Sequence, residues 1–283
     1  MNKTRQLQMK ELEIAKTIIS ICEKHNLRWY GWFGTAIGAV RHNGFIPWDE
    51  DLDLALPEED YDELAEIMEK ELPYPLEVLR YAGQYRLEHI VVHDTSTTFI
   101  DKNRIEWPEW YRGIFIDIFP LRGMPSNHIS QVAYFTLTDF LNKSHKYHRY
   151  DISACPTWKS KLVYLFVPDK ATNRVLDWLT RRYPFENADY YGFNTEIKRE
   201  KHCYKKETIS NYVEIPFEDI MMRLPSGYHQ VLTQEYGDYM VLPPPEKREL
   251  ISEGGIIDFD VSYRYYINKK RGEVGKEINP CEK

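Results

Sequence analysis

The segment from Gly31 to Leu56 concentrates acidic side chains beside apolar residues with the pattern of a strand. Asp49, Glu50, Asp51 and Asp53 place four carboxylates within five positions. Residues i and i+2 of a strand point to the same face, so Asp51 and Asp53 project together if 52–56 is a strand. Adjacent carboxylates repel, and a divalent cation relieves that repulsion by binding oxygens from both. The spacing predicts a cation site, with a solvated acidic loop as the alternative.

A third acid occurs where the apolar pattern predicts a core strand. Asp117 is flanked by Ile116 and Ile118 in the strand-like segment 112–121. If that strand neighbours the first, its carboxylate completes a cradle of oxygen ligands. Such ligands suit Mg²⁺, or Mn²⁺ in its place.

A turn of small residues, Gly34-Thr35, lies upstream of the acids. Backbone N–H groups of such a turn bind phosphate oxygens, particularly where the turn opens a helix. Acids on nearby strands then hold a metal ion against the same phosphates. Together, the turn and the acids predict a site of phosphoryl or nucleotidyl transfer.

The elements that must position these residues follow from periodicity. Apolar residues at helical spacing predict a helix over 5–25, and aromatic residues predict a buried strand over 27–34. We expect Thr35 to cap a short helix over 36–41, because its hydroxyl can accept from free N–H groups of the first turn. Asn43-Gly44 is typical of a tight turn, and an acidic helix is predicted after Pro57.

The remaining pattern predicts an α+β fold. Short strands are expected over 77–101 and 112–121, followed by helices over 127–147 and 157–183. We expect residues 1–125 to form a catalytic core with a mixed sheet and helices. Residues 126–283 are expected to form a mostly helical C-terminal part that closes the site, without folding independently.

Composition narrows the class of protein. The 283 residues carry a net charge of −7, which argues against a nucleic-acid partner. Four widely spaced cysteines and no apolar signal segment fit a reducing, cytoplasmic environment. No apolar run approaches the roughly 18 residues that span a bilayer. Five basic residues around Cys203 form either a solvated face or a peripheral contact with membrane headgroups or an anionic acceptor: Lys198, Arg199, Lys201, Lys205 and Lys206.

The stretch "GTAIGAVRHNGFIPWDEDLDLALPEEDYDEL" closely resembles the signature of the LicD family of bacterial phosphocholine transferases, which are related to fukutin. Two further blocks are similar to that family. "GIFIDIFPL" (113–121) matches its third-carboxylate strand, and "EYGDYMVLPPPEKR" (235–248) matches its C-terminal block. The resemblance extends from Gly34 to Arg248, with little that matches over 125–230.

The resemblance implies a nucleotidyltransferase-like core of the polymerase-β type. It also implies transfer of a phosphorylated alcohol from a CDP-activated donor to a glycan hydroxyl, with release of CMP. CDP-choline is the best-known donor, and relatives use CDP-ribitol. The implied acceptors are sugars of teichoic acid, lipopolysaccharide or other surface glycans, usually still lipid-linked in the cytoplasm.

Carried over to this sequence, the resemblance implies a role for each matching residue. Asp51 and Asp53 become metal ligands, and Asp117 becomes either the base or a further metal ligand. Glu50 departs from the family pattern, where aspartate is more usual. The implied nucleotide- and phosphate-binding residues are Gly34, Thr35, Arg41 and the accessory acid Asp49.

Aromatic residues precede the Asp117 strand. Trp107, Trp110 and Tyr111 are candidates for a cage around a choline cation, with plain core packing as the alternative. His89 and His93 share one face of a strand-like segment without a third ligand, which favours structural roles.

Two rival functions remain open. One is a nucleotidyltransferase that attaches NMP to a protein or small molecule, and the other is a non-enzymatic scaffold of the same fold. Release of CMP distinguishes the phosphotransferase, whereas release of pyrophosphate distinguishes the nucleotidyltransferase. Retention of Asp51, Asp53 and Asp117 argues against the scaffold.

Overall fold

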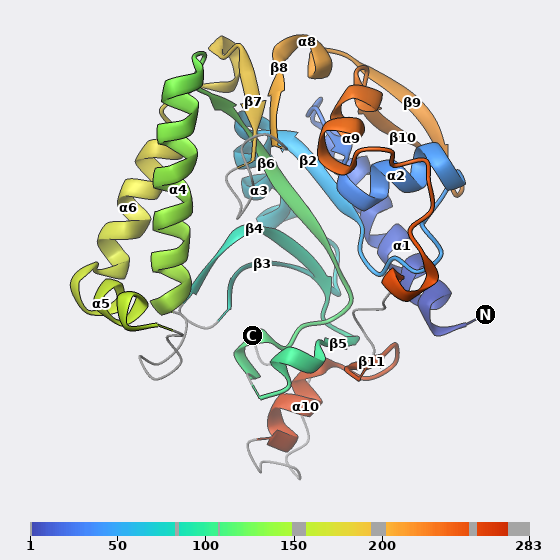
Figure 1. Ribbon diagram of the computed structural model, residues 1–283. Coiled ribbons are helices and arrows are strands. Elements are labelled where there is room, and N and C mark those ends of the chain that lie inside the picture. The colour runs from blue at the N-terminus through green and yellow to red at the C-terminus, as the bar shows by residue number, and fades with distance from the viewer. Residues whose placement is uncertain are drawn as a thin grey trace.

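The protein is described from a computed structural model (Figure 1). The structure describes residues 2–82, 85–106, 108–148, 157–193, 202–248 and 254–270. Trp107, Cys155 and Cys281 lie outside these ranges, as do the three basic residues of 198–201. Cys22 is a free, buried thiol.

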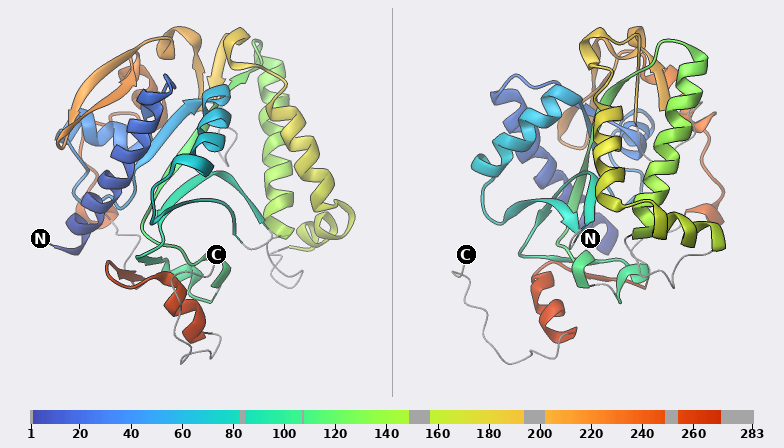
Figure 2. Two further views of the ribbon diagram at one scale, coloured as in Figure 1. Left: turned by 180° about the vertical axis from the view of Figure 1, so that it is seen from behind. Right: turned by 90° about the vertical axis from the view of Figure 1, so that its left-hand side faces the viewer.

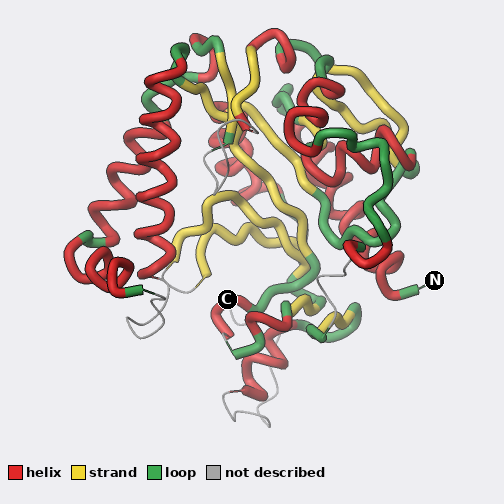
Figure 3. Tube along the Cα trace, in the orientation of Figure 1, coloured by secondary structure: helices red, strands yellow, loops and turns green. Residues whose placement is uncertain are grey.

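A curled mixed sheet runs through the middle of the molecule, drawn in yellow in Figure 3. Its main path has the order β1-β2-β6-β4-β3. The central pair, β2 and β6, is parallel, whereas the outer neighbours pair antiparallel. The five strands are β1 (Tyr30–Gly31), β2 (Asp53–Pro57), β3 (Leu76–Ala82), β4 (Tyr85–Asp94) and β6 (Phe115–Met124).

Two helices, α1 (Lys3–Lys24) and α3 (Glu58–Glu71), cover one face of this sheet (Figure 2, left). Helix α1 buries an apolar stripe that includes Leu7, Leu12 and Ile18. Acidic side chains in the first turn of α3 complement the positive end of the helix dipole. Helix α2 (Phe33–His42) lies between β1 and β2 in the chain and ends at Asn43, which adopts the left-handed conformation typical of a C-cap.

The second half of the chain begins with three helices that stand beside the sheet (Figure 1): α4 (His128–His148), α5 (Trp158–Phe166) and α6 (Asp169–Thr180). Two short strands then extend the sheet from the end of β6: β7 (Tyr190–Gly192) and β8 (Cys203–Lys205). Helix α8 (Lys206–Ile209) leads to the hairpin of β9 (Tyr212–Phe217) and β10 (Ile220–Pro225) and then to α9 (Tyr228–Tyr236).

The last described segment returns to the N-terminal half. Strand β11 (Ile256–Asp258) pairs with β5 (Thr98–Ile100), and helix α10 (Tyr263–Lys270) follows. Short 3₁₀ turns occupy Lys102–Arg104, Pro108–Trp110, Phe185–Asn187 and Pro245–Lys247. The main hydrophobic core joins both halves, because Phe217, Met222 and Leu224 are completely buried in the cluster that contains the apolar stripe of α1.

The predicted elements are largely confirmed, with one correction near the acidic segment. The predicted strand over 27–34 is reduced to Tyr30–Gly31, and α2 begins at Phe33, two residues before the predicted cap. Trp32 is the N-cap and Thr35 lies inside the helix, so the prediction that Thr35 caps it is wrong. The aromatic run favoured a strand, but Phe33 already turns the chain with a φ of 45°.

Among the described residues, no helix combines the length and the apolar character that crossing a bilayer requires.

Candidate active site

Asp53 and Asp117 face each other across the parallel pair at the centre of the sheet. Asp53 is the first residue of β2, and its register partner on β6 is Asp117. The Asp117 N–H donates to the carbonyl of Leu52 (3.1 Å), which fixes this register. Side chains at paired positions lie on the same face of a sheet, so the two carboxylates are neighbours. The tertiary structure thus unites two acids that are 64 positions apart in the sequence.

The residues before β2 bring Asp51 into the same group without making it part of the strand. Asp51 precedes β2 and forms a side-chain hydrogen bond with Asp49. Burial raises the pKa of Asp51 and of Asp53 well above the usual range, and the neighbouring carboxylates raise both further. The expectation that Asp51 and Asp53 project from one strand is therefore not met, because Asp51 lies before β2, although the two carboxylates remain electrostatically coupled.

Thr35 and Gly34 connect helix α2 to the acids. The Thr35 hydroxyl accepts a hydrogen bond from the backbone N–H of Asp53 (2.8 Å), which holds the start of β2 against α2. Gly34 lies in the first turn of the helix, and a Cβ at this position would overlap the Asp49 carboxylate. The Asp49 carboxylate therefore lies at the N-terminal end of α2, where free N–H groups favour an anion.

Helix α1 contributes two buried polar residues that the sequence analysis missed. The Gln8 side-chain amide donates to the carbonyls of Ile46 (3.0 Å) and Asp49 (2.9 Å), so it anchors the acidic segment. Glu11 is only 1% exposed, and burial together with Asp51 raises its pKa well above the usual range. Neither carboxylate oxygen of Glu11 has a hydrogen-bond partner within the described ranges. In the sequence, both residues could have been found as polar side chains on the apolar side of a predicted amphipathic helix.

His89 is a further residue that sequence reasoning did not assign to the site. Its Nε2 lies 3.2 Å from Oδ1 of Asp117, and its ring packs on Phe119 with centroids 4.4 Å apart. His93, by contrast, is buried and structural, as predicted. Its Nδ1 accepts from the Gly113 N–H (3.1 Å), and burial lowers its pKa to about 4.

A cavity of about 190 Å³ opens beside the acids. Trp110 reaches it, whereas Tyr111 is buried and its hydroxyl donates to the carbonyl of Ile105. Tyr111 thus packs in the protein interior, as the alternative reading held. The residues that line the cavity are Glu50, Asp51, Phe99, Asp101, Trp110, Arg112, Phe115 and Asp117.

Arg41 connects the first sequence block to the C-terminal block. Its Nη1 donates to the carbonyl of Tyr239 (2.6 Å), and the charge of Asp49 partly offsets the lowering of its pKa by burial. Nearby, the Arg248 guanidinium lies 4.6 Å from the centre of the Trp48 ring. The two blocks, almost 200 positions apart in sequence, are therefore in direct contact.

The acids offer the oxygen donors that a divalent cation prefers. Within the described residues, no three His, Cys, Asp or Glu side chains already have the arrangement of a metal site. Asp49 and Asp51 are turned toward each other, and Asp117 toward His89. The donors nonetheless fit Mg²⁺ or Mn²⁺, since they are carboxylate oxygens crowded at a buried position where their charges repel.

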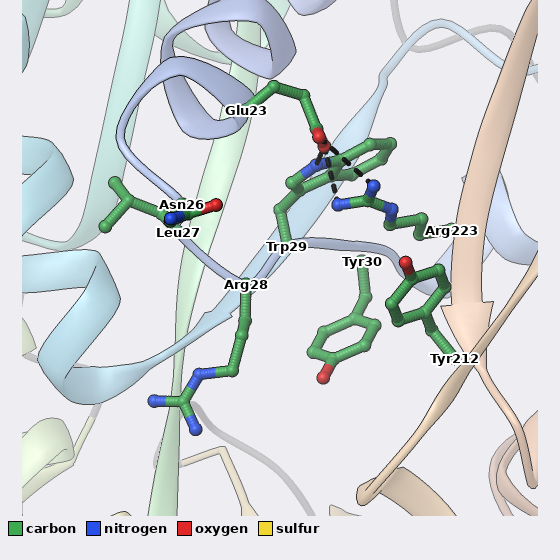
Figure 4. Close-up of a pocket in the computed structure, with 8 residues that line it drawn as sticks. All are labelled: Glu23, Asn26, Leu27, Arg28, Trp29, Tyr30, Tyr212 and Arg223. Atoms are coloured by element: carbon green, nitrogen blue, oxygen red, sulfur yellow. Dashed lines mark hydrogen bonds and ion pairs between the residues drawn. The ribbon is translucent and has the colours of Figure 1, made fainter.

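A second pocket, of about 200 Å³, lies at the end of α1 (Figure 4). Glu23 accepts from the Trp29 indole N–H (2.6 Å) and pairs with Arg223 (2.5 Å). The Arg223 guanidinium also lies 4.5 Å from the centre of the Tyr212 ring. These contacts fasten the β9–β10 hairpin to α1, which is a structural role.

Comparison with known proteins identifies the class. The family model described as "LicD/FKTN/FKRP, nucleotidyltransferase domain" matches residues 26–170, about half of the chain. The lipopolysaccharide cholinephosphotransferase LicD of Haemophilus influenzae is 28% identical over 261 residues, covering 87% of this chain and 94% of that protein. An uncharacterized protein of Rickettsia prowazekii is 30% identical over 125 residues, covering 39% of this chain and 44% of that protein.

These matches define the protein as an enzyme of the transferase class. The chain belongs to the LicD/FKTN/FKRP family. The match includes the α2 turn, the acidic segment and Asp117.

Proposed function

We propose that this protein transfers phosphocholine from CDP-choline to a hydroxyl of a lipopolysaccharide-type glycan and releases CMP. One observation carries the proposal: Asp53 and Asp117 lie opposite each other in register, with Asp51 beside them at a cavity. Similarity to a lipopolysaccharide cholinephosphotransferase over most of both chains supports the choice of alcohol and acceptor.

The acids would hold the metal ion. Asp51 and Asp53 are the proposed ligands of Mg²⁺ or Mn²⁺, and the Asp49–Asp51 hydrogen bond would open when the ion binds. A bound ion would neutralise charge on the diphosphate of the donor and so favour departure of CMP. The free N–H groups at the start of α2 would receive a donor phosphate in place of the Asp49 carboxylate.

Asp117 is the proposed proton acceptor. It would take the proton from the acceptor hydroxyl while that oxygen attacks the β-phosphorus in line. The new P–O bond joins phosphocholine to the glycan, and the bond to CMP breaks with its electron pair on the departing phosphate. His89, 3.2 Å from Oδ1, would orient this carboxylate. Most of the rate enhancement would come from positioning and charge neutralisation.

The choline group would occupy the cavity beside Trp110. A quaternary ammonium is attracted to the face of an indole ring, and Glu50 and Asp101 supply negative charge at the same cavity. Tyr111 is not part of this proposed subsite because its ring is buried and its hydroxyl is bonded to the backbone. Ribitol would need several neutral hydrogen-bonding groups, and those are scarce among the lining residues.

The test is product analysis with purified protein, CDP-choline and a dephosphocholinated lipopolysaccharide, with Mg²⁺ or with EDTA. We expect metal-dependent release of CMP and gain of phosphocholine by the glycan. CDP-ribitol as the better donor would overturn the choline assignment, and a teichoic acid as the better acceptor would overturn the glycan assignment. Pyrophosphate release from CTP would favour the nucleotidyltransferase, and absence of any metal-dependent nucleotide binding would favour the scaffold.

A further inference from the structure

The outer surface of the α4–α6 helices is unusually apolar. On α5, Trp158 is 68% exposed, Leu165 62% and Phe166 77%, and Leu162 is also exposed. These four residues have the spacing i, i+4, i+7 and i+8, so they form one continuous stripe on the solvent side of a nine-residue helix. An amphipathic helix of a water-soluble domain normally turns such a stripe inward.

The two neighbouring helices also expose large apolar side chains. Ile129 and Phe140 on α4 and Trp178 on α6 are exposed. The inner sides of the same helices are already packed, because Tyr134, Phe135 and Leu179 lie in a separate buried cluster. The exposed residues are therefore additional to the buried core of these helices. Figure 2 (right) shows the three helices at the surface of the molecule. Large apolar side chains exposed in this number mark an interaction site.

The charges on α5 and beside Trp178 favour one kind of partner. Helix α5 has Lys161 at its surface and contains no acidic residue. Just after α6, the Arg182 guanidinium lies 5.3 Å from the centre of the exposed Trp178 ring. Tryptophan beside lysine and arginine is typical of segments that lie in the headgroup region of a membrane, where the ring meets acyl chains and the cation meets phosphate.

A second copy of the chain is the less suitable partner. A two-fold contact through α5 would bring Lys161 of one copy near Lys161 of the other, with no carboxylate on that helix to offset the two charges. We propose that the apolar face of α4–α6, led by the α5 stripe, docks on the surface of an anionic phospholipid bilayer. This inference requires no assumption about the reaction catalysed.

Vesicle flotation of the full chain tests the proposal. We expect the protein to float with vesicles of equal parts phosphatidylcholine and phosphatidylglycerol, and weakly with phosphatidylcholine alone. Leu165→Gln combined with Phe166→Gln should lower the partition coefficient about tenfold or more, because the apolar stripe is lost. Met221→Gln is the matched control, since Met221 is 49% exposed on β10, outside this surface, and its substitution should leave partitioning unchanged.

A second variant reports insertion directly. Trp158→Phe should keep the partition coefficient but reduce quenching of tryptophan fluorescence by brominated lipids, which places residue 158 at the acyl boundary. Sedimentation velocity tests the alternative that this surface forms a dimer. A dimer that the double variant dissociates, without flotation of the wild type, would overturn the proposal in favour of self-association. Flotation that the double variant leaves unchanged would overturn it as well.

Discussion

At the scale of single residues, the site is built from carboxylates that destabilise one another. Asp53 is 6% exposed, and its pKa is raised by burial and by the acids at 51 and 117. A buried group that is held close to like charges needs either a proton or a cation. Under the proposed function, the site trades folding stability for cation affinity, as functional sites commonly do.

Replacing Asp53 by asparagine tests this trade. We expect Asp53→Asn to lower kcat by about 10²–10³-fold, because a charge-stabilising oxygen is lost. The free energy of unfolding in EDTA should be unchanged or higher by about 1 kcal/mol, because a buried repulsion is removed. Steady-state kinetics and urea denaturation measure the two effects. Asp139→Asn on the exposed side of α4 is the control, and normal turnover in Asp53→Asn would disprove the ligand role.

His89 is expected to act by orienting Asp117. His89→Leu removes the ring nitrogen 3.2 Å from Oδ1 and should lower kcat about 10–100-fold with little change in KM for the donor. His89→Gln keeps an N–H donor near the position of Nε2 and should recover much of that loss. The pH profile of kcat for His89→Leu should shift, since Asp117 loses its partner. Equal losses in the leucine and glutamine variants would indicate packing on Phe119 instead.

His93 makes the stability depend on pH. Its pKa in the folded protein is about 4, below the ordinary 6.5, because burial disfavours the charged ring. Only the neutral ring is compatible with the folded interior. The free energy of unfolding is therefore not reduced by His93 above pH 6.5. It falls by up to about 3 kcal/mol as the pH drops from 6.5 toward 4, because the unfolded chain takes up the proton first. His93→Asn can still accept from the Gly113 N–H and should flatten the decline in unfolding free energy between pH 6.5 and 4. An unchanged slope would contradict this assignment.

At the scale of elements, the β9–β10 hairpin is fastened to α1 at both ends. Glu218, in the hairpin turn, accepts from Arg5 (2.7 and 2.5 Å) and from the Phe45 N–H (3.1 Å). Lys16 pairs with Asp219, and Glu23 pairs with Arg223 at the far end. The hairpin thus holds the loop that leads from α2 to the acidic segment.

Glu218→Asn distinguishes the contribution of the ion pair to stability from the contribution of the turn. Glu218 has a φ of 54°, which asparagine tolerates, so this variant loses the contacts to Arg5 while the turn is preserved. We expect the free energy of unfolding to fall by about 1–3 kcal/mol. Glu218→Ala should cost more, since it also strains the turn. Glu207→Ala, at an exposed ion pair on α8, should change stability by less than about 0.5 kcal/mol in the same denaturation experiment.

At the scale of the whole molecule, the two halves of the chain share one core. Phe217, Met222 and Leu224 from the second half are completely buried with residues of α1, and β11 pairs with β5. The C-terminal block lies against α2 through Arg41. Residues 1–125 therefore lack part of their own interior.

Expression of residues 1–125 alone tests this dependence. We expect no cooperative thermal transition and weak near-ultraviolet circular dichroism, because the apolar surface that receives β9 and β10 is left exposed. The full chain should unfold in a single transition. A cooperative melt of residues 1–125 near the temperature of the full chain would show that the first half folds independently.

Much of this protein is determined by local sequence pattern. Helix α1, the acidic helix α3 and the helices after residue 127 follow from apolar periodicity, and Asn43 ends α2 as its type predicts. The acids at 51, 53 and 117 could be singled out because charged residues beside or inside a core strand are rare unless they are paired or functional. Local pattern is informative here because helix faces and strand alternation are set by near neighbours in the chain.

The tertiary structure decided how these parts meet. Strand register placed Asp117 opposite Asp53, and the neighbouring strand β4 brought His89 to Asp117. Packing of α1 under the acidic segment revealed Gln8 and Glu11, while Tyr111 proved to be buried against the backbone. None of these contacts follows from local spacing, because each depends on hydrogen bonds and packing between segments far apart in the chain. Residue types thus determined which groups were available for chemistry, and long-range pairing of the strands determined which of them lie together.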